Sequence, residues 1–195
     1  MHRIRTHRQV LGNFFEAILE GFRGAPSQQL ASLREDVQAH LSRNNKLLVA
    51  ARNEPSGGPG WREGLNMLSQ FGHSLFDALL ALQFSVEGSH EDGYAQRLEP
   101  ALGHLATDIR TGFHHVAGRI HQWRFNVPPQ GMNLEQDIAA LEARMDAVRH
   151  TGIGFSQAEI LRAYAVQLHL KQIARLLRAS RVETSHAVGE VHKEG

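Results

Sequence analysis

Apolar residues recur every three or four positions along almost the whole chain, and this spacing limits the fold more than any other feature. No segment of useful length alternates apolar and polar residues with the period of two that a half-buried strand requires. Leu and Ala are abundant, whereas aromatic residues make up only 7% of the 195 residues, which favours helices over sheets. The sequence therefore predicts an all-α protein, a bundle of about six mostly antiparallel helices.

Gly and Pro interrupt the pattern and set the approximate bounds of the predicted helices. The clearest loop is Asn53 to Gly60, and Pro100 predicts a break near Leu98 after a short helix. Because the other loops are short, successive helices should pack antiparallel. The six long helices are expected over residues 4–22, 28–52, 61–87, 102–123, from 134 through at least 148, and 157–179.

No interior change in composition marks a domain boundary. The sequence predicts a single helical bundle domain over residues 1–181. Over residues 182–195 the apolar periodicity fades, and we expect a loose C-terminal tail there.

Three segments have the composition of helix N-caps. Ser27 is expected to cap the second helix, and Asn133, with Gln136 at the third helical position, the fifth. Residues 156–159, Ser-Gln-Ala-Glu, have the pattern of a capping box at the start of the last long helix. Phe155 and Ile160 occupy the positions of a hydrophobic staple around that box.

The residues predicted to be buried share one face of each predicted helix. They are Val10, Leu11, Phe14, Phe15, Ile18, Leu19 and Phe22; Leu30, Leu33, Val37, Leu41, Leu47 and Leu48; Leu65, Met67, Leu68, Phe71, Leu75, Phe76, Leu79, Leu80, Leu82 and Phe84; Leu102, Leu105, Ile109, Phe113, Val116, Ile120 and Trp123; Leu134, Ile138, Leu141, Met145 and Val148; and Ile160, Leu161, Tyr164, Leu168, Ile173, Leu176 and Leu177.

Residues 65–86 contain a single charge, Asp77, and could be mistaken for a membrane-spanning helix. A central Asp costs roughly 2.5 to 3.5 kcal/mol on insertion into a bilayer, and three amide side chains add to that cost. The segment is therefore interpreted as an amphipathic core helix. Asp77 is expected to be buried and paired, and a structural partner is favoured over a ligand.

The chain has no cysteine, which excludes disulfides, thiolate metal sites and cysteine nucleophiles. Its formal charge is only +1 and it has no long basic run, so nucleic acid is not expected as a partner. The amino terminus is locally basic, with Arg3, Arg5 and Arg8 and no acid before Glu16. Two interpretations remain open: a solvated helix end, or a cytoplasmic segment that follows a membrane helix. No signal peptide is predicted.

Thirteen histidines are the compositional exception. His104, Asp108 and His115 fall on one helical face, where imidazole and carboxylate could bind Zn or Fe. A di-iron bundle would also need Glu-x-x-His repeats on other helices, and the sequence has none. We expect scattered surface histidines, with no metal site and no cofactor.

No segment has the pattern of a catalytic motif. Residues 57–60, rich in glycine, lack the Lys of a phosphate-binding loop, and no serine has the context of a nucleophile elbow. Glu35 and Asp36 are interpreted as solvated charges. Lys171, Arg175, Arg178 and Arg181 give the last helix a basic end, which is attributed to the helix dipole. The chain is therefore not expected to be an enzyme.

The order of segments is similar to a known family. Residues 45–55 read Asn-Lys-Leu-Leu-Val-Ala-Ala-Arg-Asn-Glu-Pro and precede a long apolar helix, while residues 141–149 and 159–177 are two further helices around a glycine turn. Over about residues 1 to 180 the chain resembles the soluble helical domain of the fusaric acid resistance (FUSC) family of bacterial inner-membrane proteins. The resemblance implies a cytoplasmic domain attached to membrane helices that export aromatic acids or related toxic compounds.

Three hypotheses follow for the function. The first is a non-catalytic domain of a FUSC-like transporter that acts in assembly or gating, with membrane-embedded helices of the same parent or of a partner as its binding partner. The second is a stand-alone interaction or oligomerisation module, which could form a homo-oligomer. The third is a metal-binding helical bundle.

Overall fold

The structure is a computed structural model of the whole chain. It describes the backbone of residues 3–25, 28–52, 59–87, 93–122, 132–151 and 154–191. The side chains are described for residues 10–25, 28–50, 66–67, 69–87, 93–115, 132–151 and 154–179.

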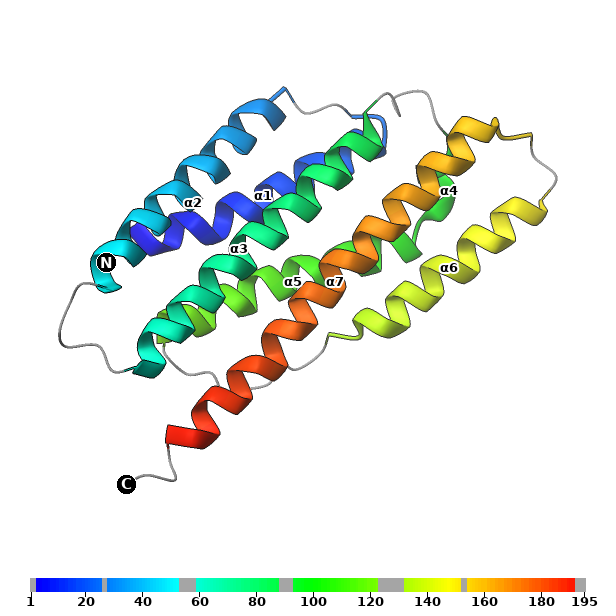
Figure 1. Cartoon of the computed structure of the whole chain (residues 1–195). Helices are drawn as coiled ribbons and strands as arrows, with labels where there is room; N and C mark the ends of the chain where they lie inside the picture. Colours follow the sequence, from blue (N-terminus) through cyan, green and yellow to red (C-terminus); the bar gives the residue numbers. More distant parts are fainter. Residues whose placement is uncertain are drawn as a thin grey trace.

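Every regular element in these ranges is a helix, and successive long helices alternate in direction (Figure 1). The predicted all-α bundle of mostly antiparallel helices is therefore confirmed. A short helix precedes Pro100, as the break near Leu98 predicted. The elements are α1 (Arg3–Phe22), α2 (Leu30–Arg52), α3 (Pro59–Val86), α4 (Tyr94–Leu98), α5 (Ala101–Gln122), α6 (Leu134–His150) and α7 (Gln157–Val191).

Four long helices form a closed ring around the core. In this ring α1 contacts α3, α3 contacts α7, α7 contacts α5, and α5 contacts α1. α2 packs over α1 and α3 at one edge, and α6 packs over α5 and α7 at the opposite edge (Figure 1). The short α4 lies at one end, against α5, α6 and α7. Both edge helices therefore keep one face towards solvent.

α1 buries its predicted apolar face. All seven of its residues that were predicted to be buried are buried, and Phe14, Phe15 and Ile18 have no exposed surface. The Phe15 ring packs edge-on against Phe113 of α5, with 5.6 Å between ring centroids. This apolar face fills the space between α2, α3 and α5.

The structure tests several of the predicted helix starts and ends. At the end of α1, Gly24 has a φ of 91°, and the Ala25 N–H donates to the Glu20 carbonyl at 2.9 Å, which satisfies an end carbonyl of the helix. α3 begins at Pro59, a first-turn position that proline tolerates. α2 begins at Leu30, and Ser27, its predicted cap, lies outside the described residues.

The capping box at the start of α7 is confirmed. The Ser156 N–H donates to Glu159 Oε2 at 2.6 Å, and the Glu159 N–H donates to Ser156 Oγ at 3.2 Å. The cap predicted at Asn133 is wrong in its mechanism, because the Asn133 side chain makes no capping hydrogen bond. Instead, the Asn133 N–H donates to Asp108 Oδ2 of α5 at 2.7 Å, so a carboxylate from another helix caps α6.

The last helix is longer than predicted. α7 continues to Val191, so the helix end near Ala179 is wrong, and residues 182–191 of the predicted loose tail are helical. These residues contain no proline, and extending an existing helix is much easier than starting one. The predicted role of the basic residues changes as a result, because Lys171, Arg175 and Arg178 are not at the helix end.

Candidate functional site

Three large side chains of α7 point away from the bundle. Leu161 and Leu168 are each 60% exposed and Tyr164 is 38% exposed, although all three were predicted to be buried. Their spacing of three and then four residues puts them on one helical face, which we name the α7 row. The residues of α7 that do face the core are Ala163, Val166, Leu170, Ile173, Ala174 and Leu177.

α7 is thus apolar on two faces, and its neighbours cover only one of them. Phe84 of α3 is 62% exposed, where burial was predicted, and α3 packs against α7. Phe84 stands near the carboxyl end of α3, which lies at the same end of the bundle as the amino end of α7 (Figure 1). A second exposed pair, Leu47 and Val49, lies on α2, so Leu47 was also wrongly predicted to be buried.

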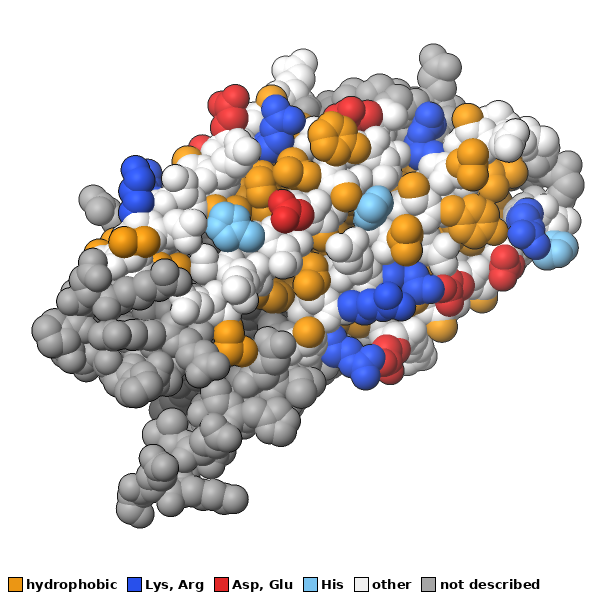
Figure 2. Space-filling view, viewed as in Figure 1, with side chains coloured by type: hydrophobic (Ala, Val, Ile, Leu, Met, Phe, Trp, Pro, Cys, Tyr) orange, Lys and Arg blue, Asp and Glu red, His pale blue; other side chains and the backbone are white. Residues whose placement is uncertain are grey.

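Three exposed arginines lie around the amino end of α7, and we name them the arginine border: Arg97, Arg144 and Arg149. Arg149 Nη1 donates to the Tyr164 hydroxyl at 3.4 Å. The Arg97 guanidinium lies 5.4 Å from the centre of the Phe155 ring, and Arg144 Nε donates to the Arg97 carbonyl at 2.6 Å. Figure 2 shows apolar side chains over the amino-terminal half of α7, with Lys and Arg side chains around them.

Aromatic packing fixes this end of the bundle. Phe155, just before α7, packs edge-on against Tyr94 of α4, with 4.7 Å between ring centroids. Burial raises the pKa of the Tyr94 phenol, and the nearby Tyr164 and Asp146 raise it further while Arg149 opposes them. Tyr94 is therefore neutral near pH 7 and acts as a packing residue under the α7 row.

Further along α7, ion pairs join the same flank, the one that faces α6, to that helix. Lys171 Nζ binds Glu142 Oε1, and Arg178 binds Glu135. Gln167 Nε2 also donates to Glu142 Oε1, at 3.1 Å. The predicted helix-dipole role is therefore wrong for Lys171 and Arg178, because their partners are carboxylates on the neighbouring helix.

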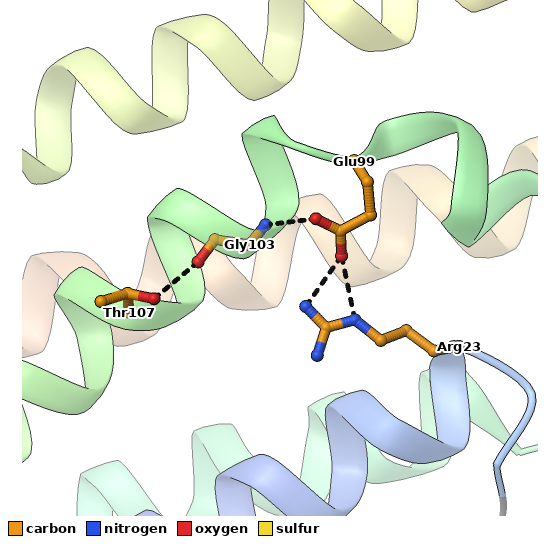
Figure 3. Close-up of polar contacts among 4 residues, drawn as sticks. All are labelled: Arg23, Glu99, Gly103 and Thr107. Carbon is orange, nitrogen blue, oxygen red and sulfur yellow. Dashed lines mark hydrogen bonds and ion pairs between the residues drawn. The ribbon is translucent and has the colours of Figure 1, made fainter.

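A second polar cluster, shown in Figure 3, joins the end of α1 to the start of α5. Arg23 donates through Nε and Nη2 to Glu99 Oε1 at 2.9 and 2.8 Å, and Glu99 Oε2 accepts the Gly103 N–H at 3.0 Å. The Thr107 hydroxyl donates to the Gly103 carbonyl at 2.9 Å. Both oxygens of Glu99 are occupied by these structural contacts, so we interpret this cluster as a joint between helices.

Asp108, a candidate ligand in the sequence, lies in a third cluster. Its carboxylate accepts the Asn133 N–H and is hydrogen-bonded to Asp137 of α6. Burial raises the pKa of Asp137, and the Asp108 charge and hydrogen bond raise it further, while His104 lowers it. His104 and His115 are exposed. In the part of the chain that the structure describes, no group of three or more His, Asp or Glu side chains could hold a metal ion.

The remaining candidate polar residues lie apart. Asp77 is exposed on α3, so its predicted burial is wrong, whereas Glu35 and Asp36 are exposed as predicted. Gln83 is the buried polar residue of α3, at 6% exposure, and its Nε2 donates to Glu87 at 3.3 Å. Gln83 Oε1 and His169 Nδ1 are buried without a hydrogen-bond partner among the described residues. No local pattern predicts the burial of either atom, because burial of one polar atom depends on the packing of neighbouring helices.

In comparisons with known proteins, no family, no curated protein and no solved structure matches this chain. Among the described residues, no helix has the length and apolar character needed to cross a membrane.

Proposed function

We propose that this chain is a helical domain that works by packing against a helix outside residues 1–195, without chemistry of its own side chains. The observation that supports this proposal is the α7 row. Leu161, Tyr164 and Leu168 form a stripe whose spacing matches the contact face of a second helix. Exposed Leu and Tyr side chains in a row carry a hydration cost that a bound helix would remove.

The resemblance to the FUSC family gives the proposal its specific form. In that form the chain is the non-catalytic soluble domain of a FUSC-like inner-membrane transporter, on the cytoplasmic side of the bacterial inner membrane. It acts in assembly or gating of a protein that exports aromatic acids or related toxic compounds. Its partner is then a membrane-embedded helix of the same parent protein or of a second protein.

Photo-crosslinking in the natural full-length protein tests this proposal. A benzophenone amino acid replaces Leu168 of the α7 row or, as the matched control, Glu35, which is exposed on α2 at the other edge of the bundle. We expect crosslinks from position 168 to a defined helix outside residues 1–195, and none from position 35. Equal crosslinking from both positions would contradict docking at the row.

The transporter form has a separate test. The parent reading frame should contain runs of about 20 apolar residues next to this segment. If it does not, the transporter form is wrong, whereas the docking function of the α7 row is unaffected.

A second copy of the chain is the alternative partner, because Leu161 and Leu168 are seven residues apart, as in a helix pair. Light scattering on the purified chain distinguishes the two. A stable dimer that becomes a monomer in Leu168→Arg would favour the oligomerisation module, and a monomer would favour a foreign helix.

A further inference from the structure

We propose that the partner of the α7 row is an amphipathic helix with acidic side chains along the edge that faces α6 and α4. This inference rests on the proposed function and adds the chemistry of the partner. It is carried by the arginine border, which makes one side of the row electropositive.

Around the start of α7, exposed arginines outnumber exposed acids among the described residues of α4 and α6. Arg97, Arg144 and Arg149 are exposed, and none of them forms an ion pair within the described residues. Most acidic side chains near these arginines already have another partner. Glu142 binds Lys171, and Glu159 is held in the capping box, which leaves Asp146 as the exposed acid of this α6 segment.

Two of the arginines contact aromatic residues at the amino end of α7, so a helix that covers the row and extends past this end would reach them. Arg149 contacts the hydroxyl of Tyr164, a member of the row, and Arg97 lies over Phe155 at the start of α7. A helix with apolar residues at positions i, i+3 and i+7 would cover the row. Glu or Asp on the flank of that helix would then reach guanidinium groups that can bind carboxylates through two hydrogen bonds.

A second copy fits this surface less well than a foreign helix. In a two-fold symmetric dimer both copies would present the same surface, and this surface has no acidic border among its described residues to meet the arginines. A bilayer surface fits less well too, because acidic side chains lie among the basic ones on this face (Figure 2).

Two synthetic helical peptides of about 18 residues test the inference. Both carry Leu at i, i+3 and i+7; one has Glu and the other Lys along the same flank. Binding to the full chain is measured by fluorescence anisotropy at low and high salt. We expect the acidic peptide to bind at least about 10-fold more tightly than the basic one, with an affinity that falls as salt rises.

Matched variants separate the contribution of charge to peptide binding from the contribution of apolar contact. In R97E/R149E the acidic peptide should lose at least about 10-fold in affinity, while Arg43→Glu, an exposed arginine on α2, should leave it unchanged. Leu168→Ser should weaken both peptides. The salt dependence of the unmodified chain tests the charge even if a variant fails to fold.

The outcomes distinguish the inference from the proposed function. Equal binding of both peptides that is lost in Leu168→Ser would overturn the acidic partner and leave docking at the row intact. No binding of either peptide would overturn the inference, and the crosslinking from position 168 would still decide the proposed function. Stronger binding to vesicles of phosphatidylcholine with phosphatidylglycerol than to the acidic peptide would also overturn it.

Discussion

α1 and α7 are predicted from the same apolar periodicity, yet the bundle uses them differently. On α1 one apolar face is buried completely, and Phe14 and Phe15 lie at its centre. On α7 the inward face is built around Leu170 and Ile173, and a second apolar face with Leu168 remains exposed. Periodicity therefore shows that a helix has an apolar face, but with two such faces the neighbouring helices decide which one enters the core.

The kinds of contact differ between the two regions as well. Aromatic rings pack α1 against its neighbours, Phe15 against Phe113 of α5 and Phe14 against Phe76 of α3. By contrast, the outer flank of α7 is held to α6 by partly exposed ion pairs such as that of Lys171 with Glu142. Because exposed ion pairs stabilise weakly, substitutions in the α1 region should cost more than substitutions in the α6–α7 layer.

Phe15→Ala should produce the largest effect. Removing a fully buried ring leaves a cavity, and we expect the free energy of unfolding to fall by about 3 to 5 kcal/mol in urea denaturation. Leu168→Ala is the matched change on the exposed face of α7 and should alter it by no more than about 0.5 kcal/mol. Similar losses of unfolding free energy in the two variants would contradict the proposed difference between the buried face of α1 and the exposed face of α7.

Gly103→Ala tests the joint between α1 and α5. A Cβ at this position would lie 2.7 Å from Glu99 Oε2, so the carboxylate must leave the Gly103 N–H. We expect Gly103→Ala to be about 1 kcal/mol less stable in thermal unfolding than the control Gly12→Ala, because the lost helix cap offsets the better helix propensity of Ala. Gly12→Ala on α1 meets no atom within 4 Å and should instead be stabilising. If both substitutions raise the stability, the contacts of Glu99 with Gly103 contribute little to the free energy of unfolding.

Ser156→Ala tests what holds the amino end of α7. Losing the capping hydroxyl should lower stability by about 1 kcal/mol. Hydrogen bonds from Ser156 lower the pKa of Glu159, so the stability linked to Glu159 is present above its ordinary pKa and is lost as pH falls through the folded value. The variant should therefore raise the Glu159 pKa, measured by carboxyl NMR. Ser32→Ala, near the start of α2, is the control, since its hydroxyl donates only to the Gln29 carbonyl. An unchanged Glu159 pKa would contradict this cap.

Asp137→Asn should have the smallest effect, at the joint of α5 and α6. The pKa of Asp137 is raised from 3.8, so its favourable contribution is complete below 3.8 and is lost as pH rises through the folded value. At neutral pH the variant removes repulsion with Asp108 and should be more stable by less than about 1 kcal/mol. Thermal unfolding from acid to neutral pH, with exposed Asp36→Asn as control, measures this. A variant that is less stable than the parent at neutral pH would refute it.

Local sequence patterns were sufficient to predict a hydrogen bond where one short segment contains both its donor and its acceptor. The capping box of Ser156 and Glu159 is an example, because its two hydrogen bonds span three residues. The cap of α6 could not be predicted in the same way. Its acceptor, Asp108, lies 25 residues before Asn133 and reaches it only because α5 and α6 pack together.

The candidate site also combines features that the sequence predicts with features that depend on helix packing. Leu161, Tyr164 and Leu168 are visible in the sequence as an apolar stripe, and burial was the natural prediction for them. Their exposure depends on where α3, α5 and α6 touch α7. The arginine border could not be recognised, since Arg97 and Arg149 are 52 residues apart and meet only where α4 and α6 flank the start of α7.

The sequence by itself determined the helical class, the order of the helices and most of their starts, because hydrogen bonds, propensities and glycine or proline breaks act within a few residues. It also determined the buried face of α1, which has only one apolar stripe. The tertiary structure alone decided which face of α7 is covered, which carboxylates bind Lys171 and Arg178, and that Asp77 is exposed. These outcomes depend on the packing of helices that are distant in the chain, and no local pattern records that packing.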